Sequence, residues 1–403
     1  MRFLIYIFIF FCFFPYINII NIGTDTQPNA LVAAAVLLFS IGNKKLNTPI
    51  ILLWVLFLFS LVLALFSQLG AFETVKNVLN YLSTPLICFA AYNVFIKMKY
   101  RMPFAVFLGI VLCYFFVAFM QMFVSPDFMT FLLNQGARGV MLGGRGVVSL
   151  CPEPAFYGSL CLFMMVFSFI QYNRRQNLIL IPLLLIQLVL FAQSATSIMV
   201  FVVALLVYVV YQLLRFRLNY VMYTLVFLLL GTAVVSTQYD KFQNSRVGLL
   251  MGEVMENPLL LSQIDVSAGV RITSTISPYY VARHNAFMPM GWGTYKSFIS
   301  RLNQSGHYPK LLNKYIVNEI GRLGGGINMI LFHLGFLGLL FPFAIWMCFR
   351  PLFDRGMAVF AFLLFFILLF TQIQLMQSMI GFILATALYL SRYSPKVKPE
   401  GFV

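Results

Sequence analysis

One carboxylate, Glu153, lies in a long stretch of the sequence that is almost free of acids. Between Lys76 and Ser236 the only other acid is Asp127, and Glu153 is held between two prolines in the segment SLCPEPAFYG. A carboxylate at the edge of an apolar span is costly unless it is paired or hydrated, so we expect a functional role. It could accept a proton from an attacking hydroxyl or orient that hydroxyl. The alternative is a structural ion pair with Arg145.

Two groups of arginines could bind an anion. Arg138 and Arg145 lie in the glycine-rich run GARGVMLGGRG, where exposed backbone N–H groups could form an anion nest. Arg271 and Arg283 are twelve residues apart in a second polar segment, with Pro278 between them, so spacing alone does not bring them together. Guanidinium groups suit phosphate oxygens. We therefore expect a phosphate site, and the alternative is a solvated basic surface.

A histidine and three aromatic residues accompany the second group of arginines. His284 directly follows the last of them, and Tyr279, Tyr280 and Trp292 are close in sequence. The aromatic rings could stack on sugar faces or anchor the segment at the membrane interface. His333 falls in an apolar segment and is expected to be a hydrogen-bonded interior residue. The sequence has no zinc-ligand spacing, Walker P-loop, acidic metal cluster or GxSxG elbow, so we expect neither a metal nor a cofactor.

Apolar segments must position all of these residues. The chain has 403 residues, of which 61% are hydrophobic and 9% charged, with a mean hydropathy of +0.91. A helix needs about 20 apolar residues to cross the roughly 30 Å of hydrocarbon in a bilayer. We therefore predict an all-α polytopic membrane protein. Its twelve predicted spans are 3–21, 28–42, 49–67, 77–96, 103–124, 153–172, 177–192, 197–214, 220–236, 327–348, 356–371 and 375–391.

Every second turn between the predicted spans is basic. These turns and Arg2 hold 15 of the 27 Lys and Arg residues, which explains much of the net charge of +16 without nucleic acid. The positive-inside rule then places both termini in the cytoplasm and retains the first span. The single transmembrane domain 1–403 has two long outward loops, 125–152 and 237–326. The longer loop has nine Lys and Arg residues against five acids, an excess that also favours an anion site.

Three segments resemble the bacterial O-antigen polymerase and ligase family. They are SLCPEPAFYG, the stretch from Arg271 to PMGWG, and GFLGLL at 335–340. The resemblance implies a multi-span protein of the bacterial inner membrane with periplasmic loops and a GT-C-like glycosyltransferase architecture. It also implies that undecaprenyl-diphosphate-linked oligosaccharide is both donor and acceptor, that no cofactor is used, and that a chain-length regulator protein is a partner. The Arg-x10-Gly pattern of some polymerases is absent, because Arg145, Arg271 and Arg283 have no glycine eleven residues later.

This family reaction gives each candidate residue a role. Glu153 would act on the acceptor hydroxyl, while Arg145 and Arg271 would stabilise the departing diphosphate. The remaining candidates would bind the diphosphate or the sugars: Arg283, Arg138, His284, Tyr279, Tyr280 and Trp292.

Three other functions are alternatives. An O-antigen ligase shares the donor and the topology but transfers glycan to the lipid A core. A flippase for lipid-linked oligosaccharide is a transporter of similar length, although it predicts short loops and basic residues inside the bundle. A loop that only docks partner proteins would leave Glu153 without a role.

Overall fold

The computed structural model describes fourteen stretches of the chain: 2–19, 24–42, 44–67, 69–99, 102–134, 146–215, 269, 273–276, 278–280, 283, 285–304, 325–355, 357–371 and 373–393. Within these residues the fold is all-α and contains no strand. One isolated bridge pairs Ile17 with Leu133. The all-α class predicted from the sequence is therefore confirmed for the described residues.

The helices before residue 215 are α1 (Arg2–Phe13), α2 (Asn29–Ser40), α3 (Thr48–Ala64), α4 (Ala71–Met98), α5 (Phe104–Phe123), α6 (Pro154–Gln171), α7 (Arg174–Ile186) and α8 (Ala195–Leu214). A π-helical turn, η2 (Gln187–Ala192), extends α7, and a short 3₁₀ turn, η1 (Thr130–Leu132), follows α5. The later helices are α14 (Tyr295–Gln304), α16 (Gly326–Leu334), η3 (Gly335–Leu339), α17 (Leu340–Phe349), η4 (Arg350–Leu352), α18 (Ala358–Thr371) and α19 (Ser378–Tyr393).

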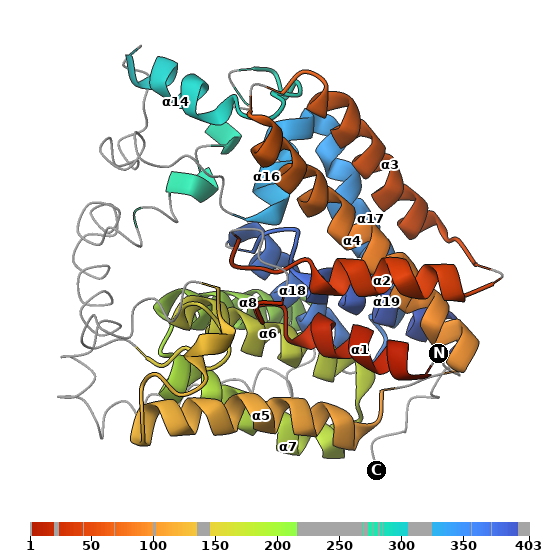
Figure 1. Cartoon of the computed structure of the whole chain (residues 1–403), viewed down its shortest axis with the longest axis vertical. Helices are drawn as coiled ribbons and strands as arrows, with labels where there is room; N and C mark the ends of the chain where they lie inside the picture. Colours follow the sequence, from red (N-terminus) through yellow and green to blue (C-terminus); the bar gives the residue numbers. More distant parts are fainter. Residues whose placement is uncertain are drawn as a thin grey trace.

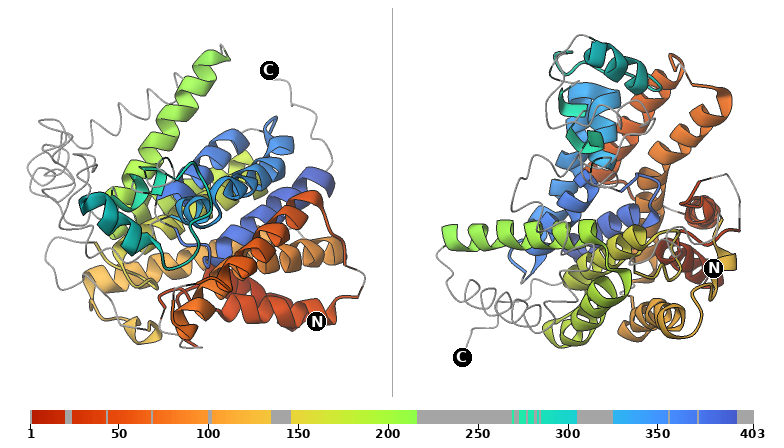
Figure 2. Two further views of the ribbon diagram at one scale, coloured as in Figure 1. Left: turned by 90° about the horizontal axis from the view of Figure 1, so that it is seen from above. Right: turned by 90° about the vertical axis from the view of Figure 1, so that its left-hand side faces the viewer.

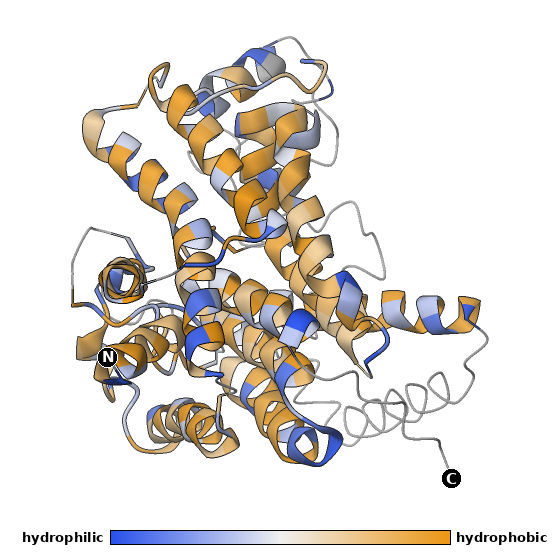
Figure 3. Ribbon diagram, turned by 90° about the vertical axis from the view of Figure 1, so that its right-hand side faces the viewer, coloured by the Kyte–Doolittle hydropathy of each residue, from blue (hydrophilic) through white to orange (hydrophobic). Residues whose placement is uncertain are grey.

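Six of the described helices are long and apolar enough to cross a membrane. They are 71–98, 104–123, 154–171, 174–192, 195–214 and 326–352, and four shorter apolar helices accompany them. Hydrophobic residues make up most of the ribbon (Figure 3), and many large apolar side chains are exposed. In α8, for example, the exposed fractions of Met199, Leu206 and Val210 are 54%, 50% and 55%. Apolar side chains on outer faces are expected where the surrounding solvent is lipid, so the protein is embedded in a membrane.

Each predicted span except 220–236, which lies outside the described residues, overlaps a helix. The first is shorter than predicted: α1 ends at Phe13 because Pro15 cannot continue the helical hydrogen bonding. The span predicted at 77–96 begins earlier, at Ala71, and an ion pair of 3.0 Å joins Glu73 to Lys76 within its first two turns. The span predicted at 327–348 is interrupted by the 3₁₀ turn η3.

The helices run in two main directions. In Figure 1, α1, α2 and α5 lie across the view, whereas α3, α4 and α17 run steeply. The start of α1, the end of α2, the end of α4 and the start of α5 lie toward the right side, and their opposite ends lie away from it. Seen from two other sides, α8 projects beyond its neighbours at its C-terminal end (Figure 2).

The packing of α19 against α4 forms the centre of the fold. Gly381 lies so close to α4 that an added Cβ would be 2.8 Å from the carbonyl oxygen of Thr84. Two hydroxyls of α4 donate to the connection between α18 and α19, Ser83 to the Met376 carbonyl over 3.2 Å and Thr84 to the Leu375 carbonyl over 3.1 Å. Small residues allow such close helix approach in membranes. The α18–α19 connection is thereby fixed inside the protein.

Candidate functional site

Glu153 lies at the N-terminal end of α6, as the sequence predicted. It is the residue before the first helical position, which Pro154 occupies, and its backbone is extended with φ −146° and ψ 154°. Proline is favoured at that position because its missing N–H has no partner there in any helix. The Glu153 carbonyl accepts the backbone N–H groups of Phe156 and Tyr157, both over 3.1 Å.

The loop that leads to Glu153 is fixed by Gln121 of α5. The Gln121 side chain accepts the Ser149 N–H over 2.6 Å and donates to the Ser149 carbonyl over 2.9 Å. Ser149 has a φ of +52°, which is unfavourable for a residue other than glycine, and its hydroxyl donates to the Tyr114 carbonyl over 2.8 Å. Such a conformation persists only where its surroundings determine it strongly. Gln121 and Tyr114 therefore determine the path of the backbone four residues before Glu153.

Two glycines bring this segment close to its neighbours. The N–H of Val147 donates to the Phe191 carbonyl over 2.8 Å, and a Cβ on Gly146 would be 2.3 Å from that same oxygen. A Cβ on Gly158 would be 2.7 Å from the hydroxyl oxygen of Ser197 in α8. These contacts explain why glycines flank the motif at the π-helical turn and at the α6–α8 interface.

Tyr16 and Asp25, from the connection between α1 and α2, lie beside Glu153. The Tyr16 ring is 5.6 Å from the ring of Phe156, centroid to centroid. Burial raises the pKa of the Tyr16 hydroxyl well above its ordinary value, and Cys151, Asp25 and Glu153 raise it further by their negative charge when ionised. The α1–α2 connection therefore contributes to the same polar region as the start of α6.

Tyr279 contacts the beginning of α16 and the end of α18. Its hydroxyl donates to Asn328 Oδ1 over 2.8 Å, and its ring stacks on that of Phe370 with centroids 5.4 Å apart. Asn328 in turn donates from Nδ2 to the Phe370 carbonyl over 2.8 Å. Burial raises the pKa of Tyr279 above its ordinary value. One face of this ring is thus covered by protein.

Trp292 is fully buried and is not available to stack on a sugar, contrary to one of the two roles predicted for it. Its ring stacks on Tyr81 of α4 with centroids 5.7 Å apart, and the Tyr81 hydroxyl is 2.9 Å from His333 Nδ1. The N–H groups of Met290 and Gly291 donate to the carbonyls of α16 residues, the latter to His333 over 3.2 Å. The polar segment folds back onto the membrane helices because its backbone N–H groups find acceptors in α16 and the Trp292 ring is buried there. His333 is the buried, hydrogen-bonded residue that the sequence predicted.

The PMGWG and GFLGLL segments lie against each other. Gly335 has a φ of +58°, and a Cβ there would be 2.2 Å from the Phe287 carbonyl oxygen. The N–H of Phe336 donates to that oxygen over 2.9 Å. No other residue type fits at Gly335 unless one of the two segments moves.

The end of α18 and the α18–α19 connection together link the separate clusters. Phe370 contacts Tyr279, a Cβ on Gly326 would be 2.9 Å from the Leu375 side chain, and Gln377 Nε2 donates to the Tyr16 hydroxyl over 3.3 Å. A single short segment therefore contacts the α1–α2 connection beside Glu153 and the polar segment around Tyr279.

The structure places only some of the predicted site residues. Arg283 is exposed and Tyr280 is half-buried. Four candidates lie outside the described residues: Arg138, Arg145, Arg271 and His284. The predicted phosphate site and the Glu153–Arg145 pair therefore stay predictions. Three residues of these clusters were not predicted, and their only signal in the sequence is a polar or aromatic residue beside an apolar run: Tyr16, Asp25 and Tyr81.

The described residues contain no group of three His, Cys, Asp and Glu side chains that could hold a metal ion. Chemically, the region offers a carboxylate at a helix start near a tyrosine hydroxyl and a second carboxylate, a set able to accept protons and to bind hydroxyl groups. The sequence matches no protein-family model, and no curated protein is significantly similar to it.

Proposed function

We propose that this chain is a membrane glycosyltransferase that lengthens lipid-linked oligosaccharides outside the cytoplasm, in the manner of an O-antigen polymerase. The observation that carries the proposal is the position of Glu153 at the start of α6, beside Tyr16 and Asp25, in a segment fixed by Gln121 and two close glycine contacts. An acid held in a fixed position at a helix end, at the edge of an apolar bundle, favours proton transfer over simple packing.

In this reaction a sugar hydroxyl on the acceptor attacks the anomeric carbon of the donor glycan. The bond between that carbon and the diphosphate oxygen breaks, undecaprenyl diphosphate departs, and Glu153 accepts the hydroxyl proton. The charge that develops on the leaving group would be met by Arg145, Arg271 and Arg283. Arg283 is exposed and so accessible to such a group.

The proposed topology has twelve spans, cytoplasmic termini and the loops 125–152 and 237–326 in the periplasm of a bacterial inner membrane. Two observations support it. Every predicted span within the described residues overlaps a helix. The ends of α1, α2, α4 and α5 also alternate between two sides of the molecule, which agrees with the alternation of basic turns in the sequence (Figure 1).

The test is reconstitution. The purified protein in proteoliposomes is incubated with undecaprenyl-diphosphate-linked repeat units, and the products are separated on a gel. A ladder of lengthened glycans on the lipid is expected. Transfer only after lipid A core is added would instead identify a ligase, and translocation without lengthening would identify a flippase. Absence of all three activities with substrate from the native pathway would overturn the proposal.

A further inference from the structure

Three buried side-chain amides around the α1–α2 connection have oxygens without a hydrogen-bond partner among the described residues. They belong to Gln27, Asn29 and Gln377, whose side chains are 2%, 4% and 2% exposed. From this cluster we infer a binding site for a membrane lipid with a hydroxyl-rich head group. The head group binds these amide oxygens, and the hydrocarbon chain of the lipid lies in the cavity between α1 and α2.

The orientation of two of the amides is fixed by their other contacts. Gln27 donates from Nε2 to the Thr24 carbonyl over 2.7 Å, and Asn29 donates from Nδ2 to the Ile17 carbonyl over 2.8 Å. A carbonyl can only accept, so each amide must present its nitrogen to that partner and its oxygen away from it. The unpartnered oxygens of Gln27 and Asn29 are therefore not the result of an exchanged oxygen and nitrogen.

The three amides are arranged along one segment of backbone. The Gln27 N–H donates to the Pro15 carbonyl over 2.9 Å, Asn29 holds the Ile17 carbonyl, and Gln377 donates to the hydroxyl of Tyr16 between them. Buried acceptors without donors destabilise a protein. Several such acceptors beside one segment indicate a ligand that supplies the missing donors.

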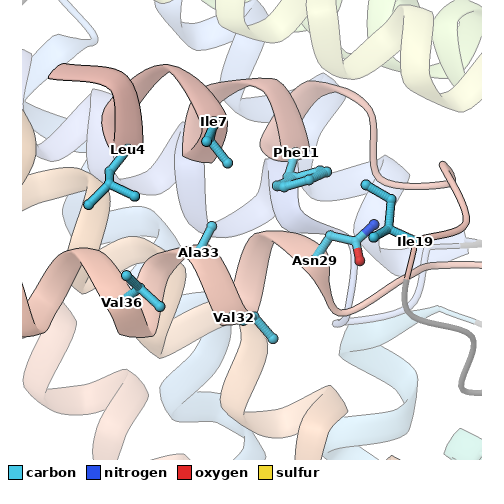
Figure 4. Close-up of a pocket in the computed structure, with 8 residues that line it drawn as sticks. All are labelled: Leu4, Ile7, Phe11, Ile19, Asn29, Val32, Ala33 and Val36. Atoms are coloured by element: carbon cyan, nitrogen blue, oxygen red, sulfur yellow. The ribbon is translucent and has the colours of Figure 1, made fainter. Parts of the chain in front are cut away.

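An apolar cavity of about 190 Å³ adjoins this polar group. It lies between α1, which contributes Leu4, Ile7 and Phe11, and α2, which contributes Val32, Ala33 and Val36. Asn29 is the one amide among the residues that line the cavity, and it lies at the end next to the α1–α2 connection (Figure 4). Val32 and Val36 are 46% and 45% exposed, so the cavity is accessible from the outer surface of the helices. An apolar cavity with a polar end fits an amphiphile.

The chemistry of the polar end selects the head group. Amide oxygens, together with the carboxylates of Asp25 and Glu153 near Tyr16, are acceptors, and the carboxylates repel anions. Hydroxyl groups of a sugar supply donors without a negative charge, whereas a phosphate at this position would be repelled.

Photolabelling tests the site without any requirement for glycan synthesis. The probe is an alkyl glucoside with a diazirine in its chain, added to the full-length protein in phosphatidylcholine nanodiscs. Peptide mapping should place the label on α1 and α2, and glucosyl diacylglycerol should compete with it. Phosphatidylglycerol and phosphatidylethanolamine should not. Equal competition by either phospholipid, or a label mapped away from these helices, would overturn the inference.

Paired variants test the two parts of the site. Ala33→Phe fills the cavity and should abolish specific labelling, whereas Leu112→Phe on the exposed face of α5 should not.

Gln377→Met removes one acceptor from the polar end of the site. It should weaken competition by glucosyl diacylglycerol about fivefold, the size expected for one buried hydrogen bond. Gln377→Glu retains an acceptor and should retain competition. Thermal unfolding identifies any variant that fails to fold. Unchanged labelling in folded Ala33→Phe, or unchanged competition in folded Gln377→Met, would contradict the inference, and neither result depends on polymerase activity.

Discussion

The side chain of Gln377 donates a hydrogen bond to the hydroxyl of Tyr16 over 3.3 Å, although the two residues are 361 positions apart in the chain. Ser378 strengthens the same junction, since its hydroxyl donates to the Cys12 carbonyl over 2.9 Å at the end of α1. The first helix is therefore fastened to the last one on the side of the protein that contains Glu153. Any movement of the α1–α2 connection would also move the polar surroundings of this carboxylate.

Glu153→Gln should abolish glycan lengthening without unfolding the protein. Glutamine keeps the size of the side chain but cannot accept the hydroxyl proton, and loss of a general base typically lowers the rate by about 10²- to 10⁴-fold. The rate is measured with lipid-linked repeat units in proteoliposomes. Asp127→Asn, which removes an exposed acid, is the matched control and should have the wild-type rate. A wild-type rate in Glu153→Gln would remove Glu153 from the mechanism.

Gly158→Ala should destabilise the protein, whereas Gly109→Ala should not. The added methyl group at position 158 would be 2.7 Å from the Ser197 hydroxyl oxygen, but at position 109 nothing lies within 4 Å. Overpacking costs about 1–3 kcal/mol, while alanine in place of an exposed helical glycine stabilises by about 0.5–1 kcal/mol. Thermal unfolding in detergent compares the two variants with the wild type. Equal midpoints would mean that α6 and α8 pack less closely than the structure shows.

Gln121→Leu should loosen the loop before Glu153. It leaves the Ser149 N–H and carbonyl without their side-chain partner, and each unsatisfied buried group costs about 1–3 kcal/mol. Hydrogen exchange of residues 146–153, followed by mass spectrometry, should become faster. Gln374→Leu, at an exposed position, should leave exchange in this segment unchanged. Unchanged exchange in Gln121→Leu would show that Tyr114 and the glycine contacts hold the loop without Gln121.

The sequence predicted the helices well because each apolar run is long and is interrupted by charges or prolines. The sequence also predicted Glu153 at the start of α6, since a proline pair next to an apolar run indicates a helix start. It could not predict the contact between Tyr16 and Gln377, because no periodicity relates residues so far apart. Trp292 shows a second limit. It lies in a polar segment but is buried, because Gly291 and Gly293, with φ of +74° and +81°, let the backbone turn toward α16.

Tyr81→Phe should destabilise the packing of the PMGWG segment without removing catalysis. The change leaves His333 Nδ1 without the hydroxyl that lies 2.9 Å away, and a buried polar atom left unpaired costs about 1–3 kcal/mol. His333→Phe alone should cost a similar amount. In the double variant the two losses should not add, because each single change already breaks the same hydrogen bond, and a coupling of about 0.5–3 kcal/mol is expected. Thermal unfolding of the four proteins measures this coupling. Additive losses would show that the two side chains do not interact, and loss of glycan lengthening in a well-folded Tyr81→Phe variant would assign the pair a part in the reaction.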